Sequence, residues 1–396
     1  MGNNSSTPNS KEYALMFDSF SYAPVTTYRT EATYTARFQG ENFINYQDLI
    51  DKPAPLLRTA YWGLWSMKIL NGIGPEPRVG QCHVYDQETD SLIIAYGYSS
   101  NGQYLNDAWA LNLNPLGWRC ITKNLLSPRS YASSVLLGRR MYFFGGAYEN
   151  DFYADLHYLD LDTGEVKLLN TTGADKPVPR TSPAIFSSKN HIYLWSGFDG
   201  RAHGSVYRIR PSTGEWKRAQ KYNTGVPAPA FCEHKGEFYV FGGVTGTPMA
   251  KFNPIEGKLR PIPCTGVEPT HELAHASLVS VNEFIFLIGG ETNVKYMHIF
   301  ALDVKRSWWF AFHVRPDNDS LTLQDGIINK TGNFMLPREH SASVIYSPRE
   351  REIVSVMGSK MINPPPVFCL KIGHALAVLH LRSDMLDMFL VDHGQK

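Results

Sequence analysis

The side chains best suited to metal or nucleophilic chemistry are scattered along this sequence. No cysteine belongs to a CxxC pair or a Cys/His cluster, which argues against a zinc site or a disulfide framework. Three of the 13 histidines, His83, His275 and His340, lie near predicted strands, and we interpret them as structural. We predict no metal site and no cofactor. The cysteines are Cys82, Cys120, Cys232, Cys264 and Cys369.

Arginine and tyrosine offer a different chemistry, the recognition of another molecule. An arginine follows a proline at the start of several units of the chain, and a guanidinium group can form two parallel hydrogen bonds to a carboxylate or a phosphate. Tyrosine and arginine are also common in binding hot spots. The alternative is structural, with each arginine pairing with an aspartate or a backbone carbonyl of the neighbouring repeat. The arginines in question are Arg78, Arg129, Arg180 and Arg338.

Composition limits the classes of partner and the location. The 38 Lys and Arg residues nearly balance the 37 Asp and Glu residues, so no basic field favours nucleic acid, which we exclude as a partner. The first twelve residues are polar and lack the apolar core of a secretory signal, and an intracellular, cytoplasmic location is expected. The start, MGNNSS, fits the N-myristoylation pattern at Gly2, or matches it by coincidence. A single acyl chain would give only weak membrane anchoring.

The elements that position these residues form an internal repeat. A strongly apolar run that ends in small residues recurs six times, as in MYFFGG (141–146) and FYVFGG (238–243). Apolar side chains on both faces of such a run indicate a buried strand. A tryptophan closes several units. The first small residues are Gly97, Gly145, Ser196, Gly242, Gly289 and Gly358, in steps of 48, 51, 46, 47 and 69 residues.

These units resemble kelch repeats, because they combine a diglycine, downstream acidic or aromatic residues and a tryptophan in about fifty residues. One glycine is replaced by Tyr98, Ser196 and Ser359 in three units. The resemblance implies an all-β, six-bladed propeller of four-stranded blades, closed by pairing the N-terminal and C-terminal segments. Trp65 is expected on the outer strand of the last blade. The alternative is seven blades, with residues 374–381 supplying that strand and residues 13–70 part of a further blade.

The expected organisation has four parts. Residues 1–12 form a flexible tail with the myristoylation signal, 13–76 an extension, 77–372 the kelch repeats, and 373–396 a C-terminal strand and tail. The step of 69 residues leaves an insertion at 313–336, which we expect on the binding face as a functional or a disordered loop.

The resemblance also implies a binding face, made by the loop before each inner strand and the loop after each diglycine. A protein partner with an acidic or phosphorylated segment would suit its arginines. The predicted site residues are Arg78, Tyr104, Arg129, Tyr148, Phe152, Tyr153, Arg180, Arg201, His203 and Arg338.

We therefore predict a non-catalytic interaction scaffold, membrane-associated or cytoskeletal in setting, and not an enzyme. GxSxG, P-loop and HExxH motifs are absent from the sequence. Two alternatives stay open. One is a kelch-type metal-dependent enzyme with a site at the mouth of the channel, and the other is a recognition subunit or adaptor of a larger enzyme complex.

Overall fold

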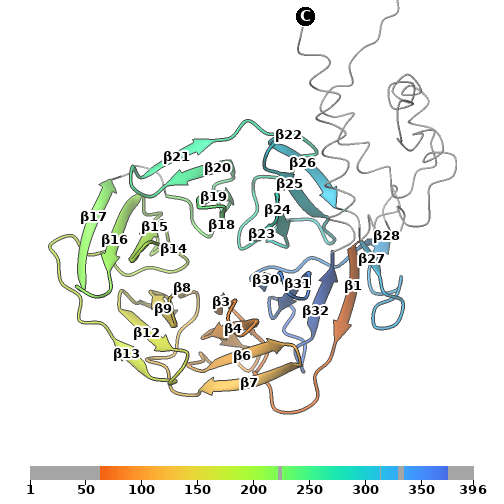
Figure 1. The fold of residues 1–396 in the computed structure, drawn as a ribbon, viewed down its shortest axis with the longest axis horizontal. Helices are drawn as coiled ribbons and strands as arrows, with labels where there is room; N and C mark the ends of the chain where they lie inside the picture. The colour runs from red at the N-terminus through yellow and green to blue at the C-terminus, as the bar shows by residue number, and fades with distance from the viewer. Residues whose placement is uncertain (1–62, 222–224, 313, 329–333, 373–396) are drawn as a thin grey trace, which may run out of the picture.

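The computed structural model describes residues 63–221, 225–312, 314–328 and 334–372, and the regular elements in these ranges are all β-strands. Six antiparallel sheets stand around a common axis as the blades of a ring (Figure 1). The predicted six-bladed propeller is confirmed, and the seven-bladed alternative is wrong. Gly2 and the proposed strand at 374–381 lie outside the described residues. Within the described ranges, no helix is long and apolar enough to cross a membrane.

The first three blades each contain four strands in chain order. Between the second and third strands, blade 1 has the short strand β5 (Tyr98–Ser99) and blade 2 has one small hairpin. Blade 1 consists of β3 (Cys82–Asp86), β4 (Ser91–Ala95), β6 (Ala108–Leu113) and β7 (Leu116–Thr122). Blade 2 consists of β8 (Ser133–Leu137), β9 (Arg140–Phe144), β12 (Leu156–Asp160) and β13 (Val166–Leu168). Blade 3 consists of β14 (Ala184–Ser188), β15 (His191–Trp195), β16 (Ser205–Arg210) and β17 (Glu215–Lys221).

The other three blades follow the same order from the axis outward. Blade 4 consists of β18 (Ala230–His234), β19 (Glu237–Gly242), β20 (Thr247–Asn253) and β21 (Lys258–Pro261). Blade 5 consists of β23 (Ser277–Val281), β24 (Phe284–Ile288), β25 (Ile299–Asp303) and β26 (Trp308–Phe312). Blade 6 consists of β30 (Ser343–Ser347), β31 (Glu352–Val356), β32 (Val367–Lys371) and β1 (Gly63–Lys68).

Blade 6 closes the ring with strands from both ends of the described chain. β1 pairs antiparallel with β32, and Trp65 lies opposite Leu370. The predicted place of Trp65 on the outer strand of the last blade is therefore confirmed. β1 also pairs the edge of β32 that would otherwise be open to association with other strands.

The second strand of each blade is almost wholly buried, as its apolar sequence predicts. In the described residues the apolar core divides into six clusters, and each cluster lies between two neighbouring blades. In each cluster, side chains from the two facing sheets interdigitate. Because every blade is covered on both sides, the loops at the two ends of the strands are the surfaces left for function.

The described part of the insertion, residues 314–328 and 334–336, is packed against the ring. β27 (Val314–Pro316) adds to the outer edge of blade 6 by parallel pairing with β1, and β28 (Ile327–Ile328) pairs with β29 (Phe334–Met335). Leu321 and Phe334 are buried in the cluster between blades 5 and 6. The insertion begins at the rim and returns to the predicted binding face, where the backbone N–H of Arg338 donates to the carbonyl of Lys295.

The small-residue pair after each second strand joins one blade to the next. In five of the described joints the N–H of its second residue donates to a carbonyl of the following blade, as Gly97 does to Arg129 and Gly146 to Arg180, both at 2.9 Å. In the joint from blade 3 to blade 4 the hydroxyl of Ser196 donates to the Val226 carbonyl at 2.6 Å. A Cβ on Gly145 would lie 2.3 Å from the Arg180 carbonyl oxygen, so close approach requires a small residue there.

The structure corrects the register of this pair in blades 1 and 6. The residues with left-handed backbone at the first position are Tyr96 (φ 61°) and Met357 (φ 61°), followed by Gly97 and Gly358. Tyr98 and Ser359 therefore come after the pair and do not replace a glycine. The sequence favoured the wrong register because a bulky residue rarely adopts positive φ.

Candidate partner-binding face

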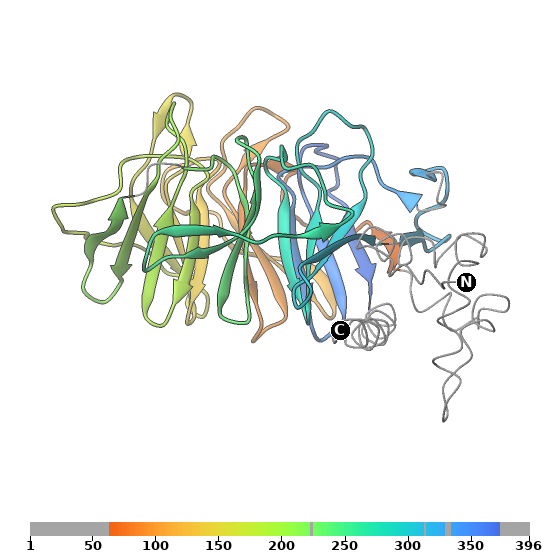
Figure 2. The ribbon, with the colours of Figure 1, turned by 90° about the horizontal axis from the view of Figure 1, so that it is seen from above.

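The predicted binding face is formed by the loops between second and third strands together with the connections between blades. Antiparallel order places both sets at the same end of every blade (Figure 2). Two small pairs of antiparallel strands shape the surface. β2 (Arg78–Val79) pairs with β5 (Tyr98–Ser99), and β10 (Ala147–Tyr148) pairs with β11 (Asp151–Phe152) in the projecting loop of blade 2.

Arg78 lies inside the joint between blades 6 and 1. Its side chain is fully buried, Nη1 donates to the Tyr96 carbonyl at 3.0 Å, and Nη2 donates to Asp107 Oδ2 at 3.1 Å. Nη1 also donates to the other oxygen of the same carboxylate. A bidentate pair of this kind satisfies the guanidinium group within the protein.

Arg129 repeats the arrangement in blade 2 and extends it into a buried network. Its Nη1 donates to Asp155 Oδ1 at 2.7 Å and to the Gly145 carbonyl at 3.1 Å. Asp155 Oδ2 lies 2.8 Å from Nδ1 of His157, whose Nε2 lies 2.6 Å from the hydroxyl of Tyr96. Burial alone would raise the pKa of Asp155, but the hydrogen bonds from His157 and Arg129 outweigh it and lower the pKa to about 2.

Arg180 lies at the same position in blade 3 without a carboxylate. Nε donates to the Val178 carbonyl and Nη1 to the Ser196 carbonyl, both at 2.9 Å. Nη2 is buried and has no hydrogen-bond partner among the described residues. By strand register, Ser205 stands where blades 1 and 2 have aspartate. Burial is the main cause that lowers the pKa of Arg180.

These contacts correct the prediction that the arginines form an exposed rim. Arg78, Arg129 and Arg180 are fully buried or nearly so, so none presents its guanidinium group to a partner. Their role matches the structural alternative, pairing with an aspartate or a carbonyl. Arg338 is partly exposed but is not their counterpart, because Glu339 supplies the carbonyl that accepts from Gly290. The sequence contained both partners of two of the ion pairs, but the repeat alone could not show which side chains the ring would bury.

Several large aromatic side chains lie on the face over blades 1 to 3, among exposed polar residues. Tyr148 and Phe152 of the β10–β11 hairpin are 38% and 37% exposed, and Phe198 of blade 3 is 41% exposed. The ring of Tyr104 lies 4.9 Å from that of Tyr98 and 4.8 Å from that of Tyr148, so the stack bridges blades 1 and 2. We call these five residues the aromatic strip.

Tyr98 and Phe198 were not among the predicted site residues, although the sequence carried a signal for them. Each directly follows the second residue of a small-residue pair, at Gly97 and Gly197, which is where the chain emerges on the face. The register error in blade 1 concealed this for Tyr98. Position after the glycine is therefore a better guide to exposure than the proline–arginine pairs.

The other predicted residues belong to the same loops but are partly engaged. The ring of Tyr153 packs under the guanidinium group of Arg129, 4.0 Å from the ring centroid. His203 Nε2 lies 2.8 Å from Asp199, which also has Arg201 at 3.8 Å. Burial, followed by the charge of Arg180, lowers the pKa of His203. Arg201 is the one of these side chains that is largely exposed.

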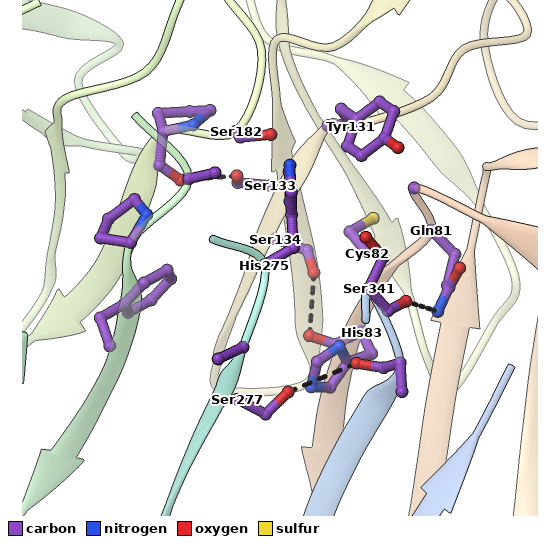
Figure 3. Close-up of a pocket in the computed structure, with 18 residues that line it drawn as sticks. Gln81, Cys82, His83, Tyr131, Ser133, Ser134, Ser182, His275, Ser277 and Ser341 are labelled. Atoms are coloured by element: carbon purple, nitrogen blue, oxygen red, sulfur yellow. Dashed lines mark hydrogen bonds between the residues drawn. The ribbon is translucent and has the colours of Figure 1, made fainter. Parts of the chain in front are cut away.

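The mouth of the central channel is a separate hollow with a volume of about 170 Å³ (Figure 3). Tyr131, His275 and Ser341 occupy equivalent positions in their blades, all with left-handed backbone. The backbone N–H of Tyr131 donates to Gly80, and that of Ser341 donates to His275, so neighbouring blades are linked around the mouth. This linkage explains the backbone conformation as part of the ring.

The channel wall is poorly equipped for catalysis. Burial lowers the pKa of His83 to about 4 and raises the pKa of Cys82 to about 12, which keeps both groups neutral near pH 7. The rings of His275 and His340 lie 6.5 Å apart. In the described part of the chain, no three His, Cys, Asp or Glu side chains gather as a metal-binding group.

Comparisons with known proteins agree with this architecture. Residues 58–243 match the family model described as the KLHDC2/KLHL20/DRC7 Kelch-repeats domain. Among curated proteins, the chain is similar to host cell factor 1 of Homo sapiens, with 30% identity over 157 residues, covering 34% of this chain and 8% of that protein. It is also similar to Kelch domain-containing protein 2 of Bos taurus, with 32% identity over 123 residues, covering 30% of each chain.

The six-bladed ring and its repeated small-residue joints define the class, a β-propeller built from kelch-type units. Together with the match of residues 58–243, they identify the chain as a kelch-repeat β-propeller protein. The aligned regions span less than a third of the length of either relative. The comparisons indicate no enzyme family.

Proposed function

We propose that this protein is a non-catalytic interaction scaffold that binds a protein partner through the aromatic strip. The observation that carries the proposal is the exposure of Tyr148 and Phe152 on a hairpin that projects from the ring (Figure 2). Large aromatic side chains in partly exposed, preformed positions supply much contact area at low entropic cost. The kelch-repeat fold supports a binding role of this general kind.

The chemistry of the partner on this face follows from the charges around the strip. Glu149 and Asp151 flank Tyr148 and are exposed, whereas the arginines that would have attracted an acidic or phosphorylated segment are buried. Arg201 is exposed but lies beside Asp199. We therefore assign the aromatic strip to a partner segment that is apolar or aromatic, with basic groups at its edge.

The test replaces Tyr148 and Phe152 together with alanine. Proteins captured from source cells by the wild-type chain would be quantified by mass spectrometry, and the partner then purified for direct binding measurements. We expect at least about tenfold weaker binding, because truncating a hot-spot aromatic side chain costs about 2 kcal/mol or more. Ile255→Ala is the matched control, since Ile255 is 67% exposed at the opposite end of blade 4. Equal binding by wild type and the double variant would refute the proposal.

A weak membrane association through Gly2 is a second part of this proposal. It depends on the MGNNSS start, which lies outside the described residues. Expression with an azide-bearing myristate analogue should label the wild-type chain and leave Gly2→Ala unlabelled. Labelling should raise recovery in the membrane fraction only modestly, because one acyl chain binds reversibly. If the wild-type chain is not labelled, the proposed membrane association through Gly2 is wrong.

A further inference from the structure

A groove of about 700 Å³ lies between blades 2 and 3, at the end of the blades opposite the aromatic strip. Its walls come from the start of β9, from β13 and from the β16–β17 turn, so the ring brings together residues that are far apart in sequence. Its volume is within the range of pockets that bind ligands, about 300 to 1,000 Å³. The side chains that the argument uses are Arg140, Tyr142, Tyr158, Lys167, Leu168 and Arg210.

The charge of the groove is one-sided. Arg140, Lys167 and Arg210 line it, and none of its lining residues is acidic. Arg140 is partly compensated, with Nε 3.3 Å from Asp160 just outside the lining. Within the described residues, neither Lys167 nor Arg210 forms an ion pair. In keeping with a positive local potential, burial and then Arg210 and Arg208 lower the pKa of the nearby His191.

The groove also places one of its cations, Arg140, against an aromatic ring and beside apolar surface. The guanidinium group of Arg140 lies 4.6 Å from the ring centroid of Tyr158, which is 5.5 Å from that of Tyr142. Cation–π contact of this kind favours an orientation in which the guanidinium group lies over the ring. Leu168 is 56% exposed along the same wall. A ligand here would meet positive charge and apolar surface together.

We propose that this groove binds an acidic segment of a partner protein, in which carboxylate side chains are interspersed with apolar ones. Carboxylates match the uncompensated charge of Lys167 and Arg210, and an apolar side chain covers Leu168. A phosphate backbone would satisfy only the charges, and the chain as a whole carries a net charge of only +1. Because the groove and the aromatic strip lie at opposite ends of the blades, the propeller can hold two partners at once.

Binding is tested with the full chain and a fluorescein-labelled peptide of glutamate and leucine, followed by fluorescence anisotropy. The comparison peptide has glutamine in place of glutamate, and a single-stranded DNA oligonucleotide of equal net charge serves as competitor. We expect the glutamate peptide to bind at least about tenfold more tightly than the glutamine peptide, with affinity that falls as salt is added.

The decisive variant is Lys167→Glu combined with Arg210→Glu, which should weaken peptide binding at least about tenfold. The matched control reverses two exposed lysines elsewhere, Lys123→Glu with Lys258→Glu, and should bind as wild type does. Unfolding temperatures would show that both variants fold. The Tyr148→Ala and Phe152→Ala variant should also bind the peptide normally, which separates this proposal from the one for the aromatic strip.

Three outcomes would overturn the inference. The wild-type chain could fail to bind the glutamate peptide, or the two charge-reversal variants could bind it equally well. The oligonucleotide could also bind more tightly than the peptide and lose affinity in the groove variant, which would assign the groove to nucleic acid.

Discussion

The joints that begin blades 1 to 3 and those that begin blades 4 to 6 use one backbone design with different side chains. In both halves, a carbonyl at the start of a blade accepts a hydrogen bond from the small-residue pair of the blade before it. The residue that supplies the carbonyl is arginine in the first half and Val226, Leu273 or Glu339 in the second half. The acceptor is a backbone carbonyl in all six joints, and the donor is a backbone N–H in five of them and the Ser196 hydroxyl in the Val226 joint. The side chain of the residue that supplies the carbonyl is therefore free to vary.

The side chains nevertheless change how each joint is stabilised. Val226 and Leu273 pack into the apolar clusters beside them and need no partner. A buried arginine loses its hydration and must recover that free energy from hydrogen bonds and a carboxylate. Arg78 and Arg129 have such a carboxylate, whereas Arg180 has carbonyls alone. The joint at the start of blade 3 therefore contains a buried arginine, Arg180, without a carboxylate to pair with it.

The largest effect should come from removing the arginine of a completed joint. Arg129→Met would leave the partly buried Asp155 carboxylate, 23% exposed, with His157 as its remaining partner. We expect the free energy of unfolding to fall by about 3 kcal/mol, the lower end of the range for breaking a buried ion pair. Arg180→Met removes a cation that has no ion pair, and its cost should be nearer about 1 kcal/mol, the value of ordinary hydrogen bonds.

Urea denaturation followed by tryptophan fluorescence would measure both losses. The comparison uses the same substitution at equivalent places in adjacent blades, so changes in side-chain volume cancel. Equal losses in the free energy of unfolding would mean that the Asp155 carboxylate does not add to the stability of the joint. The joints of blades 2 and 3 would then be equivalent in energy as well as in geometry.

Much of the fold could be predicted from the sequence because the repeat is a local pattern. The apolar second strands and the glycine pairs recur at a fixed spacing, and their burial on both faces follows from the absence of polar residues. The predicted register of the small-residue pair was wrong at Tyr96 and Met357, where a bulky residue adopts positive φ in place of glycine. At Tyr96 the hydroxyl hydrogen bond to His157 helps to hold that conformation, and such compensation cannot be seen from one repeat.

The binding residues were harder to predict, because exposure depends on neighbours distant in sequence. The proline–arginine pairs were recognised, but they lie at the start of a blade, where the next loop folds over them. The hairpin residues Tyr148 and Phe152 were predicted and are exposed. The groove formed by Arg140, Lys167 and Arg210 had no signal, since its cations come from three separate strands that meet only when blades 2 and 3 pack.

A smaller effect, of opposite sign, should follow from completing the joint of blade 3. Ser205→Asp places a carboxylate where Asp107 and Asp155 stand in the first two blades, within the setting of the buried Arg180 guanidinium group. A charge-assisted hydrogen bond inside the protein should raise the free energy of unfolding by about 1 to 2 kcal/mol, measured again by urea denaturation. Arg180→Met should then cost more in the Ser205→Asp background than in the wild type, because it would now leave a carboxylate unpaired. If the effects of the two substitutions on the free energy of unfolding are additive, the aspartate does not form an ion pair with Arg180. The ion pairs of blades 1 and 2 would then depend on neighbouring residues as well as on the carboxylate.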